Sequence, residues 1–493
     1  MKEGRNTMLR KTLLAAAAVF AATSSISQVQ AACSPDYSGT TLTVATQTGP
    51  YIASALKLGA DAWAKQTCGK VNVVEFPWSE LYPKIVTSLT SGDVAFDLIS
   101  FAPAWLPDFV PYLSEMPKDM RSGPDWDDVE PAYRERLMVW DGNIYSQSMD
   151  GDVHTYTYRI DLFNDPKEKD AFKAKYGYDL TPPKTWKQYL DIAEFFQRPD
   201  KGLWGTAEAF RRGGQQFWFF FSHAAAYTNN PNYPGAMFFD PETMDAQINN
   251  PGWVKGLEEY IRTSKLGPPN ALNFSFGEVN AAVAGGQVAE SIGWGDTGVI
   301  AADPKQSKIS GKVGSAVLPG SSEIWNAKTK TWDKFPDVLP APFMAFGGWQ
   351  TGVPKAGKNQ QAAWSFIKTL TSPEVSGQAA ITGGTGVNPY RKSHTANLAL
   401  WNKIFTPQEA KEYLGAQSDS INGKNVAFDM RLPGYFSYTE VVEIELGKAL
   451  AGQETPQQAL DTVAKEWNRL TDEFGRAKQL AAYRAAMGLP PKH

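Results

Sequence analysis

Histidine is scarce in this sequence, and the spacings that mark common catalytic and metal sites are missing. The 493 residues include four histidines, His154, His223, His394 and His493, and no two of them have the spacing of metal ligands. The GxSxG nucleophile motif, the Walker phosphate loop and the HExxH zinc motif are also absent. The sequence therefore gives no support to the enzyme classes that these motifs identify.

The chain also lacks an excess of positive charge and a long apolar run. Its 48 basic and 52 acidic side chains give a net charge of −4, so the charge balance does not favour nucleic acid or anionic lipid as a partner. The longest apolar candidate beyond the N-terminal region is 217–227, far shorter than the roughly 20 residues that span a bilayer. With 42% hydrophobic residues the composition is that of a globular protein, and the length suggests about two or three domains.

Residues 1–31 have the features of a secretory signal peptide. Four Lys and Arg residues within positions 2–11 precede an apolar run at 12–22, and Val29 and Ala31 are small residues in the positions that precede a cleavage site. An amphipathic N-terminal helix is the alternative interpretation. We expect cleavage before Ala32 and export to the periplasm.

Cysteine occurs twice, at Cys33 and Cys68, near the start of the expected mature chain. In an exported protein such a pair most simply forms one disulfide, here closing a loop of about 35 residues. The alternative is a lipidated Cys33, but Gln30 stands where that motif has an aliphatic residue. We therefore expect the disulfide.

Strand and helix patterns alternate in the first hundred residues. Residues 41–45, 71–76 and 96–101 have the pattern of short strands, whereas residues 52–63 and the segment that follows Ser79 have apolar residues at helical spacing. Ser79 is the expected N-cap of the second helix. This β-α-β-α-β order predicts a parallel sheet covered by helices, the α/β class, with ligands bound beyond the carboxyl ends of the strands.

Similar patterns continue to the end of the chain. Strands are expected at 153–158 and 289–294, and helices at 183–196, 251–263 and 276–285. A last helix is expected behind Thr455-Pro456, with an apolar stripe from Leu460 to Phe474 that we interpret as core. The segment 322–340 has a polar centre between aromatic residues, which predicts a hairpin or an ordered loop.

Two short clusters could suggest a cofactor or a metal, but their surroundings do not support either. The glycine cluster at 382–386 lacks the strand and helix context of a dinucleotide site, so we interpret it as a turn. Asp150-Gly151-Asp152 has the beginning of a calcium loop without the further acidic ligands. We expect neither a cofactor nor a bound metal.

Tryptophan is abundant, with 16 residues, and several lie beside glycine or aspartate in predicted turns. An aromatic face packs against the C–H face of a sugar ring, while carboxylates, amides and guanidinium groups bond its hydroxyls. Each tryptophan taken alone is expected in the core. The pairing with polar loop residues, as in Gly293-Trp294-Gly295-Asp296, is what indicates a carbohydrate site.

Six stretches follow one another in an order that carries a family resemblance. They are 76–85 with 92–98, 143–158 with 162–163, Pro183-Lys184-Thr185-Trp186, 276–289, 347–355 and 362–368. Their order and spacing resemble the extracellular solute-binding proteins of bacterial ABC transporters, in the sugar-binding family that is maltose-binding-protein-like. The resemblance spans most of the mature chain, and the segment 322–340 departs from it.

The resemblance implies two α/β lobes of the type II-like periplasmic-binding-protein fold, with the ligand in the cleft between them and capture by hinge closure. The implied first lobe contains residues 32–153 and 296–348, and the second lobe contains residues 156–294 and 351–493. Crossovers between the lobes are expected near 154–155, 295 and 349–350.

The candidate ligand-binding residues are those in segments that the resemblance places at the cleft. They are Trp78, Trp105, Asp150, Asp152, Glu208, Arg211, Trp294, Asp296, Gly348, Trp349, Asn388 and Arg391. The two acidic residues of the first crossover are either hydroxyl acceptors or turn residues. Glu208 and Arg211 are either cleft residues or an exposed helix pair. Trp294 with Asp296 is the pair with the best local support.

The function implied is that of a periplasmic substrate-binding component of an ABC importer, which captures a sugar, oligosaccharide or polyol and is not an enzyme. The expected partners are this ligand and the permease dimer with its ATPase; nucleic acid is not expected, and the protein is expected to be a monomer. One alternative is an exported carbohydrate-active enzyme with Glu208 and Asp296 as acid and base. The other is a carrier of a peptide or an organic acid, bound through Arg211, Arg212 or Arg391.

Overall fold

The computed structural model describes residues 33–92 and 94–492, so the expected signal peptide lies outside the described residues. The strands are β1 (Thr41–Gln47), β2 (Lys70–Phe76), β3 (Leu98–Phe101), β4 (Val139–Trp140), β5 (Asn143–Ile144), β6 (Ser146–Ser148), β7 (His154–Arg159), β8 (Trp204–Ala207), β9 (Val288–Trp294), β10 (Val313–Ala316), β11 (Ser321–Asn326), β12 (Thr331–Leu339), β13 (Phe343–Met344), β14 (Gln350–Gly352) and β15 (Ala427–Phe428).

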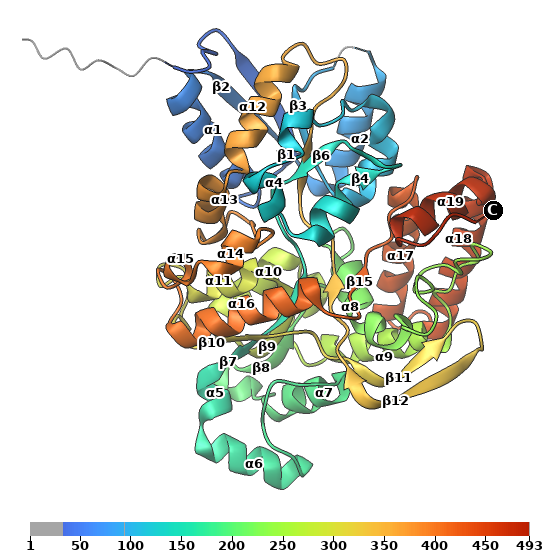
Figure 1. Ribbon diagram of the computed structural model, residues 1–493. Coiled ribbons are helices and arrows are strands. Elements are labelled where there is room, and N and C mark those ends of the chain that lie inside the picture. The colour runs from blue at the N-terminus through green and yellow to red at the C-terminus, as the bar shows by residue number, and fades with distance from the viewer. Residues whose placement is uncertain (1–32, 93, 493) are drawn as a thin grey trace, which may run out of the picture.

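Helices cover both main sheets and form the C-terminal part of the chain (Figure 1). They are α1 (Ala53–Thr67), α2 (Trp78–Thr90), α3 (Leu106–Phe109), α4 (Pro124–Asp128), α5 (Ile160–Asn164), α6 (Pro166–Tyr176), α7 (Trp186–Phe195), α8 (Gln216–Thr228), α9 (Pro251–Ser264), α10 (Phe276–Ala284), α11 (Asp296–Ala302), α12 (Gln360–Leu370), α13 (Pro373–Ala380), α14 (Lys392–Ala396), α15 (Leu398–Trp401), α16 (Pro407–Asn422), α17 (Tyr435–Leu450), α18 (Pro456–Phe474) and α19 (Arg476–Ala486).

The first main sheet has five strands in the order β2-β1-β3-β14-β6. The strands β1, β2 and β3 are parallel, as their alternation with helices predicts, whereas β14 runs antiparallel to both of its neighbours. Helices α1 and α12 pack together beside this sheet, at the top of Figure 1. Helix α2 begins at Trp78 after Pro77, whose φ is −52° and ψ 145°, so the expectation that Ser79 is its N-cap is wrong; Ser79 lies within the first turn.

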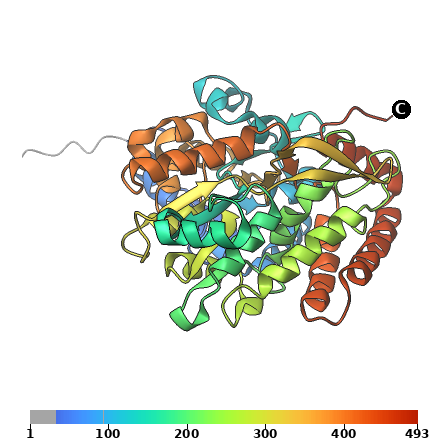
Figure 2. The same ribbon diagram turned by 90° about the horizontal axis from the view of Figure 1, so that it is seen from below.

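The second main sheet has four strands in the order β10-β7-β9-β8. All seven residues of β9 are buried because strands pair with it on both sides and helix α10 packs against it. Helix α16 packs on β10, and α7 packs on β8. In Figure 1 this sheet lies below the first one, and Figure 2 shows the same helices from below.

The membership of the sheets differs from the chain division that the sequence analysis gave. Strand β10 lies in the range 296–348 assigned to the first lobe, yet it pairs with β7 of the second sheet. Helix α12 and two of the three residues of β14 lie in the range assigned to the second lobe, yet β14 pairs with β3 and α12 packs on α1. The chain therefore passes between the sheets at 149–153, at 345–349 and again after α13. Residue 295 joins β9 to α11, and both pack with the second sheet.

The apolar run at 217–227 is a helix enclosed by protein. Every residue of α8 is buried, because α9, α17 and β11 pack around it. A helix surrounded on all sides has no polar face, which explains why its sequence is apolar almost throughout. Among the described residues, none of the helices combines the length and the apolar character needed to cross a bilayer.

The C-terminal helices and the hairpin agree with their sequence patterns. Thr455 caps α18 with a capping box, and the predicted stripe is buried from Leu460 to Leu470, whereas its last member, Phe474, is only partly buried against the core. Helix α18 packs on α17 and α9, at the right of Figure 1. The segment 322–340 forms most of the antiparallel hairpin of β11 and β12, with Trp325 opposite Trp332.

The expected disulfide joins Cys33 to Cys68 directly after α1, with the two Cα atoms 5.8 Å apart. We expect the double variant Cys33→Ser/Cys68→Ser to lose about 3 to 4 kcal/mol of unfolding free energy, because the unfolded chain regains the entropy of a loop of 35 residues. Urea unfolding of the variant and of the oxidised wild-type protein measures this difference. Equal midpoints for the two proteins would contradict the expectation.

Candidate functional site

A cavity of about 270 Å³ is lined by segments from both main sheets. The first sheet contributes the turn after β1, residues 47–52, and Trp78 at the start of α2. The second sheet side contributes the loop 211–215 before α8 and the N-terminus of α10. The passing segment 345–349 completes the wall. The cavity thus has the interlobe position in which a bound molecule contacts both halves.

Aromatic rings form much of the wall. They are Tyr51, Trp78, Phe276, Trp294, Phe346 and Trp349. Trp78 is half-buried and stacks on Trp105 at 5.0 Å between ring centroids, so a buried indole supports the one that lines the cavity. From the second sheet, Trp294 packs edge to face with Phe276, at 4.6 Å between ring centroids. The cavity therefore has apolar aromatic surfaces contributed by both sheets.

Trp294 is held in place by its backbone position and by one hydrogen bond. It is the last residue of β9, it is 3% exposed, and its indole Nε1 donates to the carbonyl of Ala345 at 2.9 Å. This bond links the end of the second sheet to the passing segment that also carries Trp349. The Trp294 ring is consequently held both by its place at the end of β9 and by its hydrogen bond to Ala345.

Two buried carboxyl groups, those of Asp152 and Asp296, also line the cavity. Burial raises the pKa of Asp296 to about 8, and the nearby Asp150 carboxylate adds to this effect. Its Oδ2 atom has no hydrogen-bond partner among the described residues. Burial and repulsion by Asp150 also raise the pKa of Asp152, which accepts a hydrogen bond from Asn388 Nδ2 at 2.6 Å. The cavity therefore holds acceptor groups whose hydrogen-bonding capacity is partly unused.

Asp150 lies behind the cavity and connects the passing segments. Its carboxylate accepts hydrogen bonds from the backbone N–H groups of Gly151 at 2.7 Å, Asn388 at 2.7 Å and Trp349 at 3.2 Å. Gly348 has a φ of +86°, and a Cβ atom there would lie 2.2 Å from the carbonyl oxygen of Asp150. Glycine is required at this position because the two passing segments are in direct backbone contact.

Six of the twelve candidate residues line this cavity, and six do not. Trp78, Asp152, Arg211, Trp294, Asp296 and Trp349 are in the lining, with Arg211 exposed to solvent. Trp105, Asp150, Asn388 and Gly348 lie behind the lining and support it through the contacts given above.

Glu208 and Arg391 are engaged elsewhere. Glu208 is fully buried, accepts a hydrogen bond from Tyr189 OH at 3.0 Å and lies 3.0 Å from His223 Nε2. Arg391 is 2% exposed; it donates to the carbonyl of Asp125 at 2.8 Å and pairs with Asp128 at 3.2 Å. Their ligand-binding roles therefore lack the geometric support that the cavity residues have.

Several lining residues were not among the candidates, and three of them have unusual backbone conformations. Ile52, Gln215 and Phe346 have φ values of +65°, +74° and +67°, in the left-handed region that side chains rarely adopt. Such conformations gather at ligand sites, where the surrounding structure enforces them. Tyr51, next to Ile52, also accepts a hydrogen bond from Asn280 Nδ2 of α10 at 3.2 Å. Nothing in the local sequence identified these residues.

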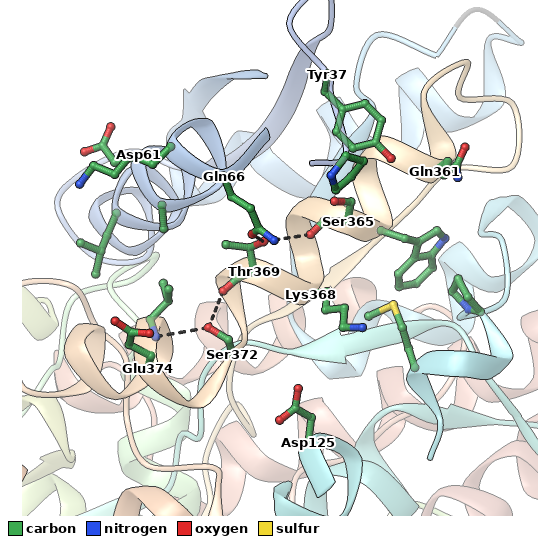
Figure 3. Close-up of a pocket in the computed structure, with 18 of the residues that line it drawn as sticks. Tyr37, Asp61, Gln66, Asp125, Gln361, Ser365, Lys368, Thr369, Ser372 and Glu374 are labelled. Carbon is green, nitrogen blue, oxygen red and sulfur yellow. Dashed lines mark hydrogen bonds between the residues drawn. The ribbon is translucent and has the colours of Figure 1, made fainter. Parts of the chain in front are cut away.

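A larger depression, of about 1120 Å³, lies on the first sheet side between α1, α12 and α13 (Figure 3). Its rim carries charges of both signs, including Asp61, Lys368 and Glu374, and Thr369 donates to Gln66 Oε1 at 3.3 Å across its floor. The helices that line it belong to the first sheet alone. A molecule bound there would favour neither an open nor a closed arrangement of two lobes.

Within residues 33–92 and 94–492, no three His, Cys, Asp or Glu side chains are grouped as metal ligands.

A comparison with protein families and known proteins gives consistent matches. A family model described as bacterial extracellular solute-binding protein matches residues 49–376. A relative from Sinorhizobium fredii, named "probable amino-acid ABC transporter periplasmic-binding protein y4oP", is 24% identical over 355 residues, which cover 71% of this chain and 72% of the relative.

Solved structures with the same fold include two ligand complexes. An ABC transporter solute-binding protein from Agrobacterium radiobacter K84, in complex with ribitol, aligns with a TM-score of 0.70 and 22% identity over 88% of this chain and 99% of that one. Maltose-bound MalE3 of T. maritima aligns with a TM-score of 0.69 and 22% identity over 87% of this chain and 100% of that one. The mixed α/β fold with two lobes, predicted from the sequence, is confirmed by these alignments.

The variant Asp296→Asn should change how the stability of the unliganded protein depends on pH. The folded protein retains the proton of Asp296 up to about pH 8, whereas an unfolded aspartate ionises near pH 3.9. Between these values the folded state binds the extra proton, so this carboxyl lowers the unfolding free energy as the pH rises. We therefore expect the unfolding free energy of the variant, relative to that of wild type, to increase by up to about 1.4 kcal/mol for each pH unit between pH 5 and pH 8. Urea unfolding at several pH values tests this, and parallel pH profiles for the two proteins would contradict it.

Proposed function

Because the chain belongs to the bacterial extracellular solute-binding protein family, we propose that it captures a sugar or polyol for an ABC importer and delivers it to the membrane permease. The observation that carries this proposal is the composition of the interlobe cavity. Six aromatic rings and two buried carboxyl groups meet there, on segments from both main sheets. Stacking surfaces together with hydrogen-bond acceptors are what a neutral hydroxylated molecule requires.

The size of the cavity favours a single sugar ring or a short polyol in this chamber. Its volume of about 270 Å³ lies at the lower limit of typical ligand pockets, which range from roughly 300 to 1,000 Å³. Two of the structural neighbours were solved with ribitol and with maltose, which supports a polyol or a sugar as the ligand class.

Each part of the cavity has a role in this proposal. Trp78 supplies the face for the C–H side of the ligand, and hydroxyl groups donate to Asp152 and to the unpartnered Oδ2 of Asp296. A hydroxyl that donates to the ionised carboxylate stabilises its charge, so binding lowers the pKa of Asp296 from its value of about 8. Ligand binding near neutral pH is then accompanied by proton release.

Closure of two lobes around the ligand follows from the sheet membership. We propose that the first lobe consists of 33–148 with 350–380, and that the second consists of 154–344 with 392–492. A ligand that touches Trp78 on one lobe and Asp296 on the other favours the closed arrangement, because it loses half of its contacts when the lobes separate. The hydrogen bond from Asn280 to Tyr51 adds a direct contact between the lobes.

The proposed cellular location and partner are based on the family and on the N-terminal sequence. We propose a periplasmic location after removal of residues 1–31, and the disulfide Cys33–Cys68 fits an oxidising compartment. The proposed partner is a permease dimer with its ATPase, which the protein meets as a monomer.

A catalytic role for Glu208 and Asp296 has little geometric support. An acid and a base must lie on either side of the bond that they cleave. Glu208 is in the core with Tyr189 and His223 and does not line the cavity. We therefore propose binding without turnover.

A second candidate ligand is a zwitterionic solute such as an amino acid. Arg211 lines the cavity together with Asp152 and Asp296, so a guanidinium group and two carboxyl groups are present. The Sinorhizobium relative, whose name refers to an amino-acid transporter, is compatible with this alternative.

A thermal-shift panel separates these ligand classes. It compares monosaccharides, polyols, disaccharides, uronic acids and amino acids, each with the purified mature protein. A ligand at about 100 times its Kd adds about 2.7 kcal/mol of stability, which is readily detected. Shifts confined to amino acids would overturn the carbohydrate assignment, and release of a reaction product would overturn the assignment as a carrier.

Truncation of the Trp78 side chain, one of the indoles that line the cavity, should weaken ligand binding. We expect Trp78→Ala to raise the Kd of the best carbohydrate in the panel at least tenfold, because the variant loses the stacking surface. Trp332→Ala is the matched control, since Trp332 is also half-buried but lies in the hairpin of β11 and β12. Titration calorimetry of both variants gives the comparison, and equal affinities would remove Trp78 from the site.

A further inference from the structure

Three carboxyl groups at the interlobe cavity are buried without a basic partner. Asp150, Asp152 and Asp296 are 0%, 7% and 4% exposed. Burial raises the pKa of all three, and repulsion among them adds to this effect for Asp152 and Asp296. Within residues 33–92 and 94–492, the main neighbours that shift these pKa values include no Lys, Arg or His side chain. Because buried carboxylates are normally paired with a positive charge, this site lacks one.

Arg211 does not supply the missing charge. It is the basic residue among the described residues of the lining, and it is exposed to solvent. Although burial acts in the opposite direction, hydrogen bonds from Ser275 and the nearby charge of Arg211 lower the pKa of the exposed Glu278. The guanidinium charge is therefore offset by an exposed carboxylate and screened by water, and the buried carboxyl groups stay uncompensated.

The surroundings of these carboxyl groups suit an ammonium group. Trp294 and Asp296 are separated by one residue, and both line the cavity together with Phe346 and Trp349. The Oδ2 atom of Asp296 has no hydrogen-bond partner among the described residues. An ammonium group is attracted to the faces of aromatic rings and donates hydrogen bonds to carboxyl oxygens. A hydroxyl group also bonds a carboxyl oxygen, but it brings no charge to balance an ionised carboxylate.

From these observations we propose that the captured solute is an aminated sugar or polyol, whose protonated amine pairs with Asp152 and Asp296 against the indole of Trp294. The hydroxyl groups and the C–H face of the solute then lie toward Trp78. An amino acid fits this charge distribution less well, because its carboxylate would need a buried cation. This inference rests on the proposed function and narrows its ligand class from hydroxylated solutes in general to those that carry a positive charge.

The test compares, by titration calorimetry, the Kd of probes that differ in charge at one position. D-glucosamine, D-galactosamine and D-mannosamine are compared with D-glucose, D-galactose and D-mannose, and 1-amino-1-deoxy-D-glucitol is compared with D-glucitol. The N-acetylated hexosamines keep the nitrogen atom but lack its charge. The titrations are made near pH 6.5, where the amines are protonated.

The test variant is Asp296→Asn, which removes the ionisable group and keeps an oxygen that accepts hydrogen bonds. Its matched control is Glu290→Gln. Like Asp296, Glu290 is a buried carboxyl group with a raised pKa and one unpartnered oxygen. Glu290 accepts a hydrogen bond from Tyr156 in the core of the second lobe and does not line the cavity.

We expect at least one aminated probe to bind the wild-type protein about tenfold or more tightly than its hydroxyl and N-acetyl counterparts, because hydrogen bonds between charged groups are the stronger ones. Asp296→Asn should reduce this preference to about threefold or less, whereas Glu290→Gln should keep it. If circular dichroism shows that Asp296→Asn is misfolded, Asp152→Asn removes the other lining carboxyl group and should give the same loss of preference.

Two results would overturn the inference and leave the proposed function standing. One is a neutral sugar or polyol that binds more tightly than every aminated probe, and the other is a preference for the amine that survives both aspartate variants. If neither the neutral nor the aminated carbohydrates bind, the proposed function fails and this inference fails with it.

Discussion

One buried carboxylate holds together the segments on which the candidate site depends. Asp150 accepts backbone hydrogen bonds from Gly151, Trp349 and Asn388, which lie on the first, second and third segments that pass between the sheets. A buried carboxylate without such donors would be costly, so these segments are constrained to stay together around it. Trp349 and the neighbouring Asp152 are in the cavity wall, and their positions therefore follow from this one cluster of bonds.

Around this fixed centre, the two sides of the cavity are built in different ways. On the first lobe Trp78 rests on Trp105. Trp78 begins the helix that follows the parallel strand β2, and Trp105 lies in the single 3-10 turn that follows the parallel strand β3. On the second lobe Trp294 ends a strand that is buried along its whole length. The rings can move toward each other only as parts of their lobes. A ligand between them would thus be held by two preformed surfaces, which keeps the entropic cost of binding low.

The sequence predicted the elements well and the site only in part. Periodicity located β1, β9, α9 and α18, because each has a regular apolar pattern and a clear beginning or end. It could not assign β10 and β14 to their sheets, because sheet membership depends on pairing between distant segments. Asp296 could be found as a polar residue after a strand, whereas Tyr51 and Phe346 reach the cavity through backbone turns that no composition pattern marks. Glu208 is the opposite case: it is a polar residue in a segment expected at the cleft, but it is buried in the core and bonded to Tyr189.

The disulfide between Cys33 and Cys68 has a consequence for the biogenesis of the protein. The sequence contains two cysteines, so a single pairing is available and no scrambled isomer of the monomer can exist. Both thiols lie near the start of the described chain, ahead of most of the first lobe and all of the second. Formation of this disulfide therefore requires an oxidant for the two thiols but no catalyst of disulfide shuffling.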